Sequence, residues 1–150
     1  MTYEDFGPER IKHLEMIQLV VARLGTDSFL VKGWAVTLNA ALLGFAISGK
    51  DWRLAAVAVI PTLALWQLDT YYLRAERLFR QLYETVRTGI PAVEPFYMGA
   101  TAPSFITKVG AANPDAVSKW WTIACSQTIT IFYGVLAAVA IALSAVLYLS

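Results

Sequence analysis

Apolar residues are concentrated in three stretches, each about as long as a membrane-spanning helix must be. The stretches cover residues 29–48, 54–73 and 120–149. A helix that rises about 1.5 Å per residue needs about 20 mostly apolar residues to cross a hydrocarbon core of about 30 Å. The pattern therefore predicts an all-α membrane protein with three transmembrane helices. The third stretch is longer than a bilayer requires, so it could tilt or protrude.

Two helical segments outside the membrane are predicted from apolar positions that recur every three or four residues. The first begins at Pro8 and ends at Gly25. Its apolar positions are Ile11, Leu14, Ile17, Val21 and Leu24. The second continues the second span and meets no Gly or Pro until Gly89 and Pro91. Its apolar positions are Leu78, Phe79, Leu82, Tyr83 and Val86. We expect the two stripes to pack together as a cytoplasmic helical layer.

The chain is accordingly divided into four segments. These are a cytoplasmic amphipathic helix at 1–28, two transmembrane helices at 29–73, a cytoplasmic helix extension with an irregular linker at 74–119, and a third transmembrane helix at 120–150. Pro61 is expected to kink the second span. The linker is expected to begin at Gly89, and Asn113 to cap the helix that follows it.

Composition and charge agree with a membrane location. Hydrophobic residues make up 57% of the 150 residues, which is too large a share for a soluble domain of this size. The net charge is only +1, but the basic residues are unevenly spread. Lys50 and Arg53 alone lie between the first two spans, whereas the others lie before the first span, at its start, or between the second and third. The positive-inside rule therefore predicts a cytoplasmic N-terminus and an external C-terminus.

Two ionisable residues lie within the spans. Lys32 and Asp69 fall at similar depth in adjacent antiparallel helices. Ionisable groups at membrane depth are usually paired or functional. The sequence favours an ion pair, or two side chains that reach the interface, and leaves a functional site as the alternative.

Polar residues also recur along the third span. They are Thr122, Ser126, Thr130 and Tyr133. Such a face could line a water-filled pore if several copies surround an axis, or it could supply hydrogen bonds between packed helices. The sequence leaves both open. Small residues continue at the same spacing, at Gly134, Ala138 and Ala142, which is typical of close helix packing.

Basic residues of the cytoplasmic layer are candidates for binding a phosphorylated ligand, because guanidinium groups match phosphate oxygens. The candidates are Lys12, His13, Arg74, Arg77, Arg80 and Arg87. Membrane topology and anionic lipid headgroups explain the same residues more simply, and the sequence favours that explanation. Glu76 and Arg80 are also spaced as a helix-supporting ion pair.

The sequence contains no recognisable catalytic motif. It has one histidine and one cysteine, Cys125, so it lacks the residues of a multi-thiolate or multi-histidine metal site. No Gly-rich loop precedes a Lys followed by Ser or Thr. We therefore expect a protein that is not an enzyme and that needs no cofactor or metal.

Two segments resemble a widespread group of small bacterial inner-membrane proteins. The first span opens with Lys32, Gly33 and Trp34. The second span closes with Leu68, Asp69, Tyr71, Tyr72, Arg74, Glu76, Arg77 and Arg80. Proteins of this build resemble the membrane effectors of anti-phage systems such as Hailong, whose effector is an oligomeric ion channel opened by an oligonucleotide.

The resemblance implies a multi-pass protein of the bacterial inner membrane that forms a homo-oligomer, with a tetramer favoured. Its signal would be an oligonucleotide made by a partner nucleotidyltransferase, and its effect would be depolarisation of the membrane. The arginines would then bind the signal, and the polar face of the third span would line the pore. The alternative is a non-conducting membrane scaffold or accessory subunit that docks a cytoplasmic partner.

Overall fold

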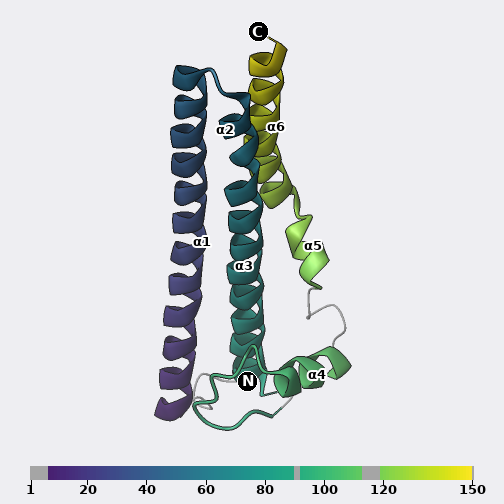
Figure 1. Ribbon diagram of the computed structural model, residues 1–150. Coiled ribbons are helices and arrows are strands. Elements are labelled where there is room, and N and C mark those ends of the chain that lie inside the picture. Colours follow the sequence, from purple (N-terminus) through teal and green to yellow (C-terminus); the bar gives the residue numbers. More distant parts are fainter. Residues whose placement is uncertain (1–6, 90–91, 113–118, 150) are drawn as a thin grey trace. The chain divides into compact units, whose positions relative to one another are not determined.

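The computed structural model describes residues 7–89, 92–112 and 119–149 (Figure 1). Its elements are α1 (Pro8–Gly49), α2 (Trp52–Val57), α3 (Val59–Thr88), α4 (Pro103–Ala112), α5 (Trp120–Ala124) and α6 (Gln127–Leu149). These described residues contain no strand. Within them, three helical stretches are long and apolar enough to cross a membrane: α1, the run from α2 through α3, and α6. The prediction of an all-helical fold with three helical stretches long and apolar enough to span a membrane is confirmed for the residues that the structure describes.

The helices belong to two compact units. Unit 1 consists of Met1–Thr26 and Tyr72–Lys119, and unit 2 consists of Asp27–Tyr71 and Trp120–Ser150. The long helices α1 and α3 each contribute one part to each unit. The units divide close to 28, 73 and 119, where the sequence predicted the chain to enter or leave the membrane.

Helix α1 does not end at Gly25, so that prediction is wrong. The helix continues without interruption from the first predicted helix into the first span. A glycine inside a helix costs only about 1 kcal/mol relative to alanine, and no proline follows to remove a backbone donor. Directly after the glycine, the Thr26 hydroxyl donates to the Ala22 carbonyl (3.1 Å), as a side chain inside a regular helix does.

The second predicted span is distorted close to Pro61. Helix α2 ends at Val57 and α3 begins after Ala58, whose backbone nevertheless keeps a helical conformation (φ −60°, ψ −20°). Pro61 has no N–H to offer the Val57 carbonyl, so one helical hydrogen bond cannot form there. From Val59 the helix then runs to Thr88, which confirms the long uninterrupted pattern. It ends as predicted at Gly89, whose positive φ of 75° suits a glycine and whose N–H donates to the Thr85 carbonyl (2.8 Å).

Unit 1 has an apolar core built from the two predicted stripes and a helix that the sequence analysis missed. Ile17 of α1 and Leu82 of α3 are fully buried. Residues 103–112 form α4, so the irregular linker predicted for 89–119 is wrong over this part. Its apolar residues complete the core, which comprises Ile17, Leu78, Leu82, Val86, Ala100, Phe105 and Val109. Ile11, predicted to be in the stripe, is 48% exposed.

In unit 2 the third predicted helix is interrupted. Helix α5 ends at Ala124, and α6 begins at Gln127. The Trp66 indole N–H donates to the Ala124 carbonyl (3.2 Å), which satisfies an acceptor that the break leaves without a helical donor. The Thr130 N–H donates to the Ser126 carbonyl (2.9 Å), so Ser126 opens α6. The cap predicted at Asn113 lies outside the described residues.

Candidate functional site

The strongest concentration of buried polar groups lies in unit 2, around Asp69. The Asp69 side chain of α3 is fully buried, and its Oδ2 lies 2.6 Å from the Nζ of Lys32 on α1. The Lys32 side chain is 21% exposed. The structure thus places together the two ionisable residues that the sequence put at similar depth.

Ser28 joins the same cluster. It lies one helical turn before Lys32 on α1, so both side chains extend from the same face. The Ser28 hydroxyl donates to Asp69 Oδ1 (2.5 Å), and Lys32 Nζ donates to Ser28 Oγ (2.9 Å). The carboxylate therefore accepts a hydrogen bond at Oδ1 and forms an ion pair at Oδ2, which has no hydrogen bond of regular geometry among the described residues. Ser28 was not among the residues predicted from the sequence, although its spacing of four from Lys32 was the available signal.

Tyr133 brings the third candidate span to the cluster. Its side chain is only 4% exposed, and its hydroxyl interacts electrostatically with the Asp69 carboxylate. The hydroxyl has no hydrogen bond of regular geometry among the described residues. Side chains from α1 and α6 thus both lie close to Asp69 of α3.

The residues predicted to share a polar face on the third span do not share one. Thr122 lies on α5, before the break, whereas Thr130 and Tyr133 lie on α6. Thr122 and Thr130 are exposed, Ser126 is half-buried and Tyr133 is buried. The prediction of a common face assumed one continuous helix. The chain instead forms two helices, separated between Ala124 and Gln127.

A second buried polar contact joins α1 and α3 nearer the other end of the unit. Asn39 Nδ2 donates to Thr62 Oγ1 (2.8 Å), and Thr62 Oγ1 donates to the Ala58 carbonyl (2.8 Å). Both side chains are almost completely buried. The sequence analysis did not single out this pair. A lone asparagine in an apolar span was the signal that could have found it.

In unit 1, three of the six candidate ligand-binding residues form ion pairs on their own helix. The pairs are Lys12 with Glu15 (3.0 Å), Arg80 with Glu76 (2.6 Å) and Arg87 with Glu84 (2.7 Å). The pair predicted between Glu76 and Arg80 is therefore confirmed. Arg77 is exposed and Arg74 is half-buried. Much of the positive charge on this surface is consequently balanced by neighbouring carboxylates.

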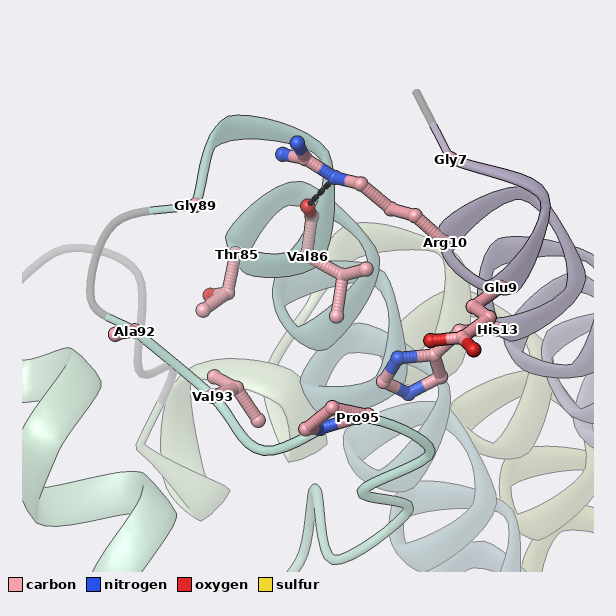
Figure 2. Close-up of a pocket in the computed structure, with 10 residues that line it drawn as sticks. All are labelled: Gly7, Glu9, Arg10, His13, Thr85, Val86, Gly89, Ala92, Val93 and Pro95. Carbon is pink, nitrogen blue, oxygen red and sulfur yellow. Dashed lines mark hydrogen bonds between the residues drawn. The ribbon is translucent and has the colours of Figure 1, made fainter. Parts of the chain in front are cut away.

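The sixth candidate, His13, lines a cavity of about 390 Å³ in unit 1 (Figure 2). The ring is 4% exposed, and Nε2 donates to the Tyr97 carbonyl (2.8 Å). Figure 2 shows the ring pointing from α1 towards Val93 and Pro95. Of the six candidates, only His13 lines this cavity.

The cavity also contains a cation that was not among the candidates. Arg10 reaches from α1 to the end of α3, where Nε donates to the Val86 carbonyl (2.8 Å) and Nη2 to the Arg87 carbonyl (2.8 Å). Figure 2 shows this side chain crossing between the two helices. Arg10 therefore satisfies carbonyls that have no donor within their own helix.

Among the residues that the structure describes, no group of three or more His, Cys, Asp or Glu side chains is placed to hold a metal ion. In comparisons with known proteins, no family model, curated protein or solved structure matches the chain.

Proposed function

We propose that the protein is a homo-oligomeric effector of a bacterial inner membrane, forming an ion channel that opens in response to a nucleotide or oligonucleotide signal. Unit 1 and the N-terminus lie in the cytoplasm, and the C-terminus lies outside. Opening depolarises the membrane as a defence against phage. The spans of one chain are too few to enclose a wide pore, so the function requires several copies, and a tetramer is the expected number.

The observation that carries the proposal is an exposed face of α6. Its residues follow one another at intervals of four and are all exposed: Thr130, Gly134, Ala138 and Ala142. Small residues allow helices in lipid to approach closely, and a hydroxyl group in hydrocarbon gains from a hydrogen-bond partner. A second copy of α6 would meet both requirements. This supports self-association through α6, with Thr130, the polar residue of this face, nearest to the conducting path.

The orientation is supported by the distribution of charge. Lys50 and Arg53 are the basic residues between α1 and α3, whereas unit 1 carries most of the others. Short segments rich in Lys and Arg remain in the cytoplasm. A signal made in the cytoplasm would then reach unit 1 directly.

Unit 1 is the part that would receive the signal. Its cavity beside His13 and Arg10 has room for a small organic group, and Arg77 and Arg80 are exposed on the same unit. Guanidinium groups bind phosphate oxygens well. We therefore assign the signal to unit 1 and the ion pathway to α6.

The first experiment measures ion flux and oligomer size for the purified protein in liposomes. Replacing Gly134 and Ala138 together with Leu should abolish both the oligomer and the flux, because bulky side chains prevent close approach. The matched control replaces Val135 and Val139 with Leu, since these residues are also exposed on α6 and should tolerate the change. Equal flux in the two double variants would contradict assembly through the small-residue face.

Two further variants separate conduction from sensing. Thr130→Val should reduce flux while the oligomer persists, because valine keeps the size of threonine and removes only the hydroxyl. Arg77→Glu with Arg80→Glu should remove the response to the signal without changing membrane insertion. Failure of insertion in the arginine variant would show that these residues set topology instead.

A non-conducting scaffold is the second candidate, and the ion pairs of unit 1 favour it. Lys12, Arg80 and Arg87 are each paired with a glutamate, and such a mixed surface suits a protein partner better than a phosphate. A scaffold would keep its oligomer and show no flux under any condition. It would also be indifferent to Thr130→Val.

A further inference from the structure

The cluster around Asp69 has more oxygen ligands than an ordinary ion pair needs. Asp69 supplies two carboxylate oxygens, Ser28 supplies a hydroxyl within 2.5 Å of one of them, and the Tyr133 hydroxyl interacts with the same carboxylate. The Tyr133 hydroxyl is buried without a regular hydrogen bond among the described residues. A buried hydroxyl normally forms a well-aligned hydrogen bond. The Tyr133 hydroxyl lies beside the carboxylate without one of regular geometry in the described part of the chain, so its oxygen is free to face a bound cation.

The two members of the ion pair differ in their access to solvent. Asp69 is fully buried, but the Lys32 side chain is 21% exposed. Lysine also has a flexible stem of four carbons that lets its ammonium group reach the membrane surface. Lys32 can therefore leave the cluster, whereas Asp69 cannot.

The cluster also lies near one end of the membrane-spanning part. At about 1.5 Å per residue, Lys32 is about 25 Å along α1 from Gly49, compared with a hydrocarbon thickness of about 30 Å. If Gly49 lies at one surface, Lys32 is close enough to the other for its ammonium group to reach water. The departure of Lys32 would leave a buried carboxylate without a counter-charge, which is strongly unfavourable unless another cation takes its place.

We propose that Asp69, Ser28 and Tyr133 form a binding site for a monovalent cation of the size of potassium, in which the Lys32 ammonium group is a tethered and displaceable occupant. An ammonium group and a potassium ion have nearly the same radius and both prefer oxygen ligands. Hard cations are bound by oxygen ligands, carboxylates above all. Binding of the ion releases Lys32 and thereby removes the charge contact between α1 and α3. The proposal does not depend on conduction or on a nucleotide signal.

The direct test uses the wild-type protein in detergent and measures how fast an amine-reactive ester modifies Lys32. Rates are determined by mass spectrometry in potassium chloride and in choline chloride at equal ionic strength. While the fraction of protein in which Lys32 has left Asp69 is small, potassium multiplies it by one plus the ratio of the potassium concentration to the dissociation constant of potassium from the vacated site. Labelling of Lys32 should therefore be about threefold faster when the potassium concentration is twice that dissociation constant. Lys50, which is exposed in the same unit, serves as the internal control and should be modified equally in both salts.

A second measurement removes the tethered occupant. Lys32→Met should show a melting temperature that rises saturably with potassium but not with choline, and the further change Asp69→Asn should abolish that rise. Equal Lys32 labelling in both salts would overturn the proposal. So would acceleration that persists in Asp69→Asn, or release of Lys32 that follows pH alone, because a proton would then be the exchanging partner and the cluster only a structural ion pair.

Discussion

The two units place their ion pairs in different environments. In unit 1, the paired residues are three or four positions apart on one helix and lie largely at the surface. In unit 2, Lys32 and Asp69 come from different helices, and Asp69 is fully buried. Exposed pairs stabilise a fold by about 0 to 1 kcal/mol, whereas removing one partner of a buried pair costs about 3 to 5 kcal/mol. Similar distances between charged atoms therefore imply very different consequences for stability.

The largest effect is expected when the buried pair loses its cation. In buffer without metal cations, Lys32→Met should destabilise the protein by about 3 to 5 kcal/mol, because the Asp69 charge remains buried. Asp69→Asn should cost less, because Lys32 can turn towards water. Thermal unfolding in detergent measures both variants. If both variants lose only a little stability, the Asp69 cluster is in contact with water. The ion pairs of the two units would then not differ in environment.

In the apolar core of unit 1, a substitution that involves no charge should cost a similar amount of stability. Leu82→Ala should cost about 3 kcal/mol, because Leu82 is fully buried among the core residues and the change leaves a cavity. Leu19→Ala is the matched control, since Leu19 is 72% exposed. Chemical denaturation followed by circular dichroism would measure the two. If both variants unfold alike, the packing assigned to unit 1 is wrong.

A smaller loss is expected at the uncharged polar contact of unit 2. Thr62→Val keeps the shape of the side chain but removes the hydroxyl that bonds to Asn39, at a cost of about 1 kcal/mol. Thr37→Val makes the same change where the hydroxyl is exposed and bonds only within its own helix. Unfolding in detergent should therefore distinguish the two variants. A Thr62 variant as stable as the Thr37 variant would show that the contact does not hold α1 against α3.

The smallest effect is expected at the surface of unit 1. Glu15→Gln removes the ion pair with Lys12, in which the two side chains are 55% and 67% exposed, and should change stability by less than about 0.5 kcal/mol. Comparing unfolding at low and high salt checks this, because salt screens the pair in the unchanged protein. A loss of stability as large as that of Lys32→Met would contradict the view that the ion pairs of unit 1 are exposed to water.

Local patterns predicted the helical content and the long helix α3. These patterns failed to predict helix ends where continuing the helix and ending it differ little in free energy. Gly25 looks like a helix end, but nothing after it competes with continuation, so α1 extends to Gly49. Helix α4 was missed because it is short, although Pro103 at its start and the four-residue spacing of Phe105 and Val109 were visible in the sequence.

The candidate site could be predicted only in part for a related reason. Depth along antiparallel spans was enough to bring Lys32 and Asp69 together. It could not show that Tyr133 faces them, because helical spacing identifies a face but not the helix that covers it. The interruption at Cys125 and Ser126 further shifted the phase of the third span, and no proline or glycine there announces it.

Arg10 has a consequence for how the helix ends of unit 1 fray. Its two hydrogen bonds fasten the first turn of α1 to the last carbonyls of α3, more than seventy positions away along the chain. When either end unwinds, the other loses the same two bonds. Backbone amides in the last turn of α3 should therefore exchange with deuterium in step with those of the first turn of α1, so the two termini would open as one cooperative element.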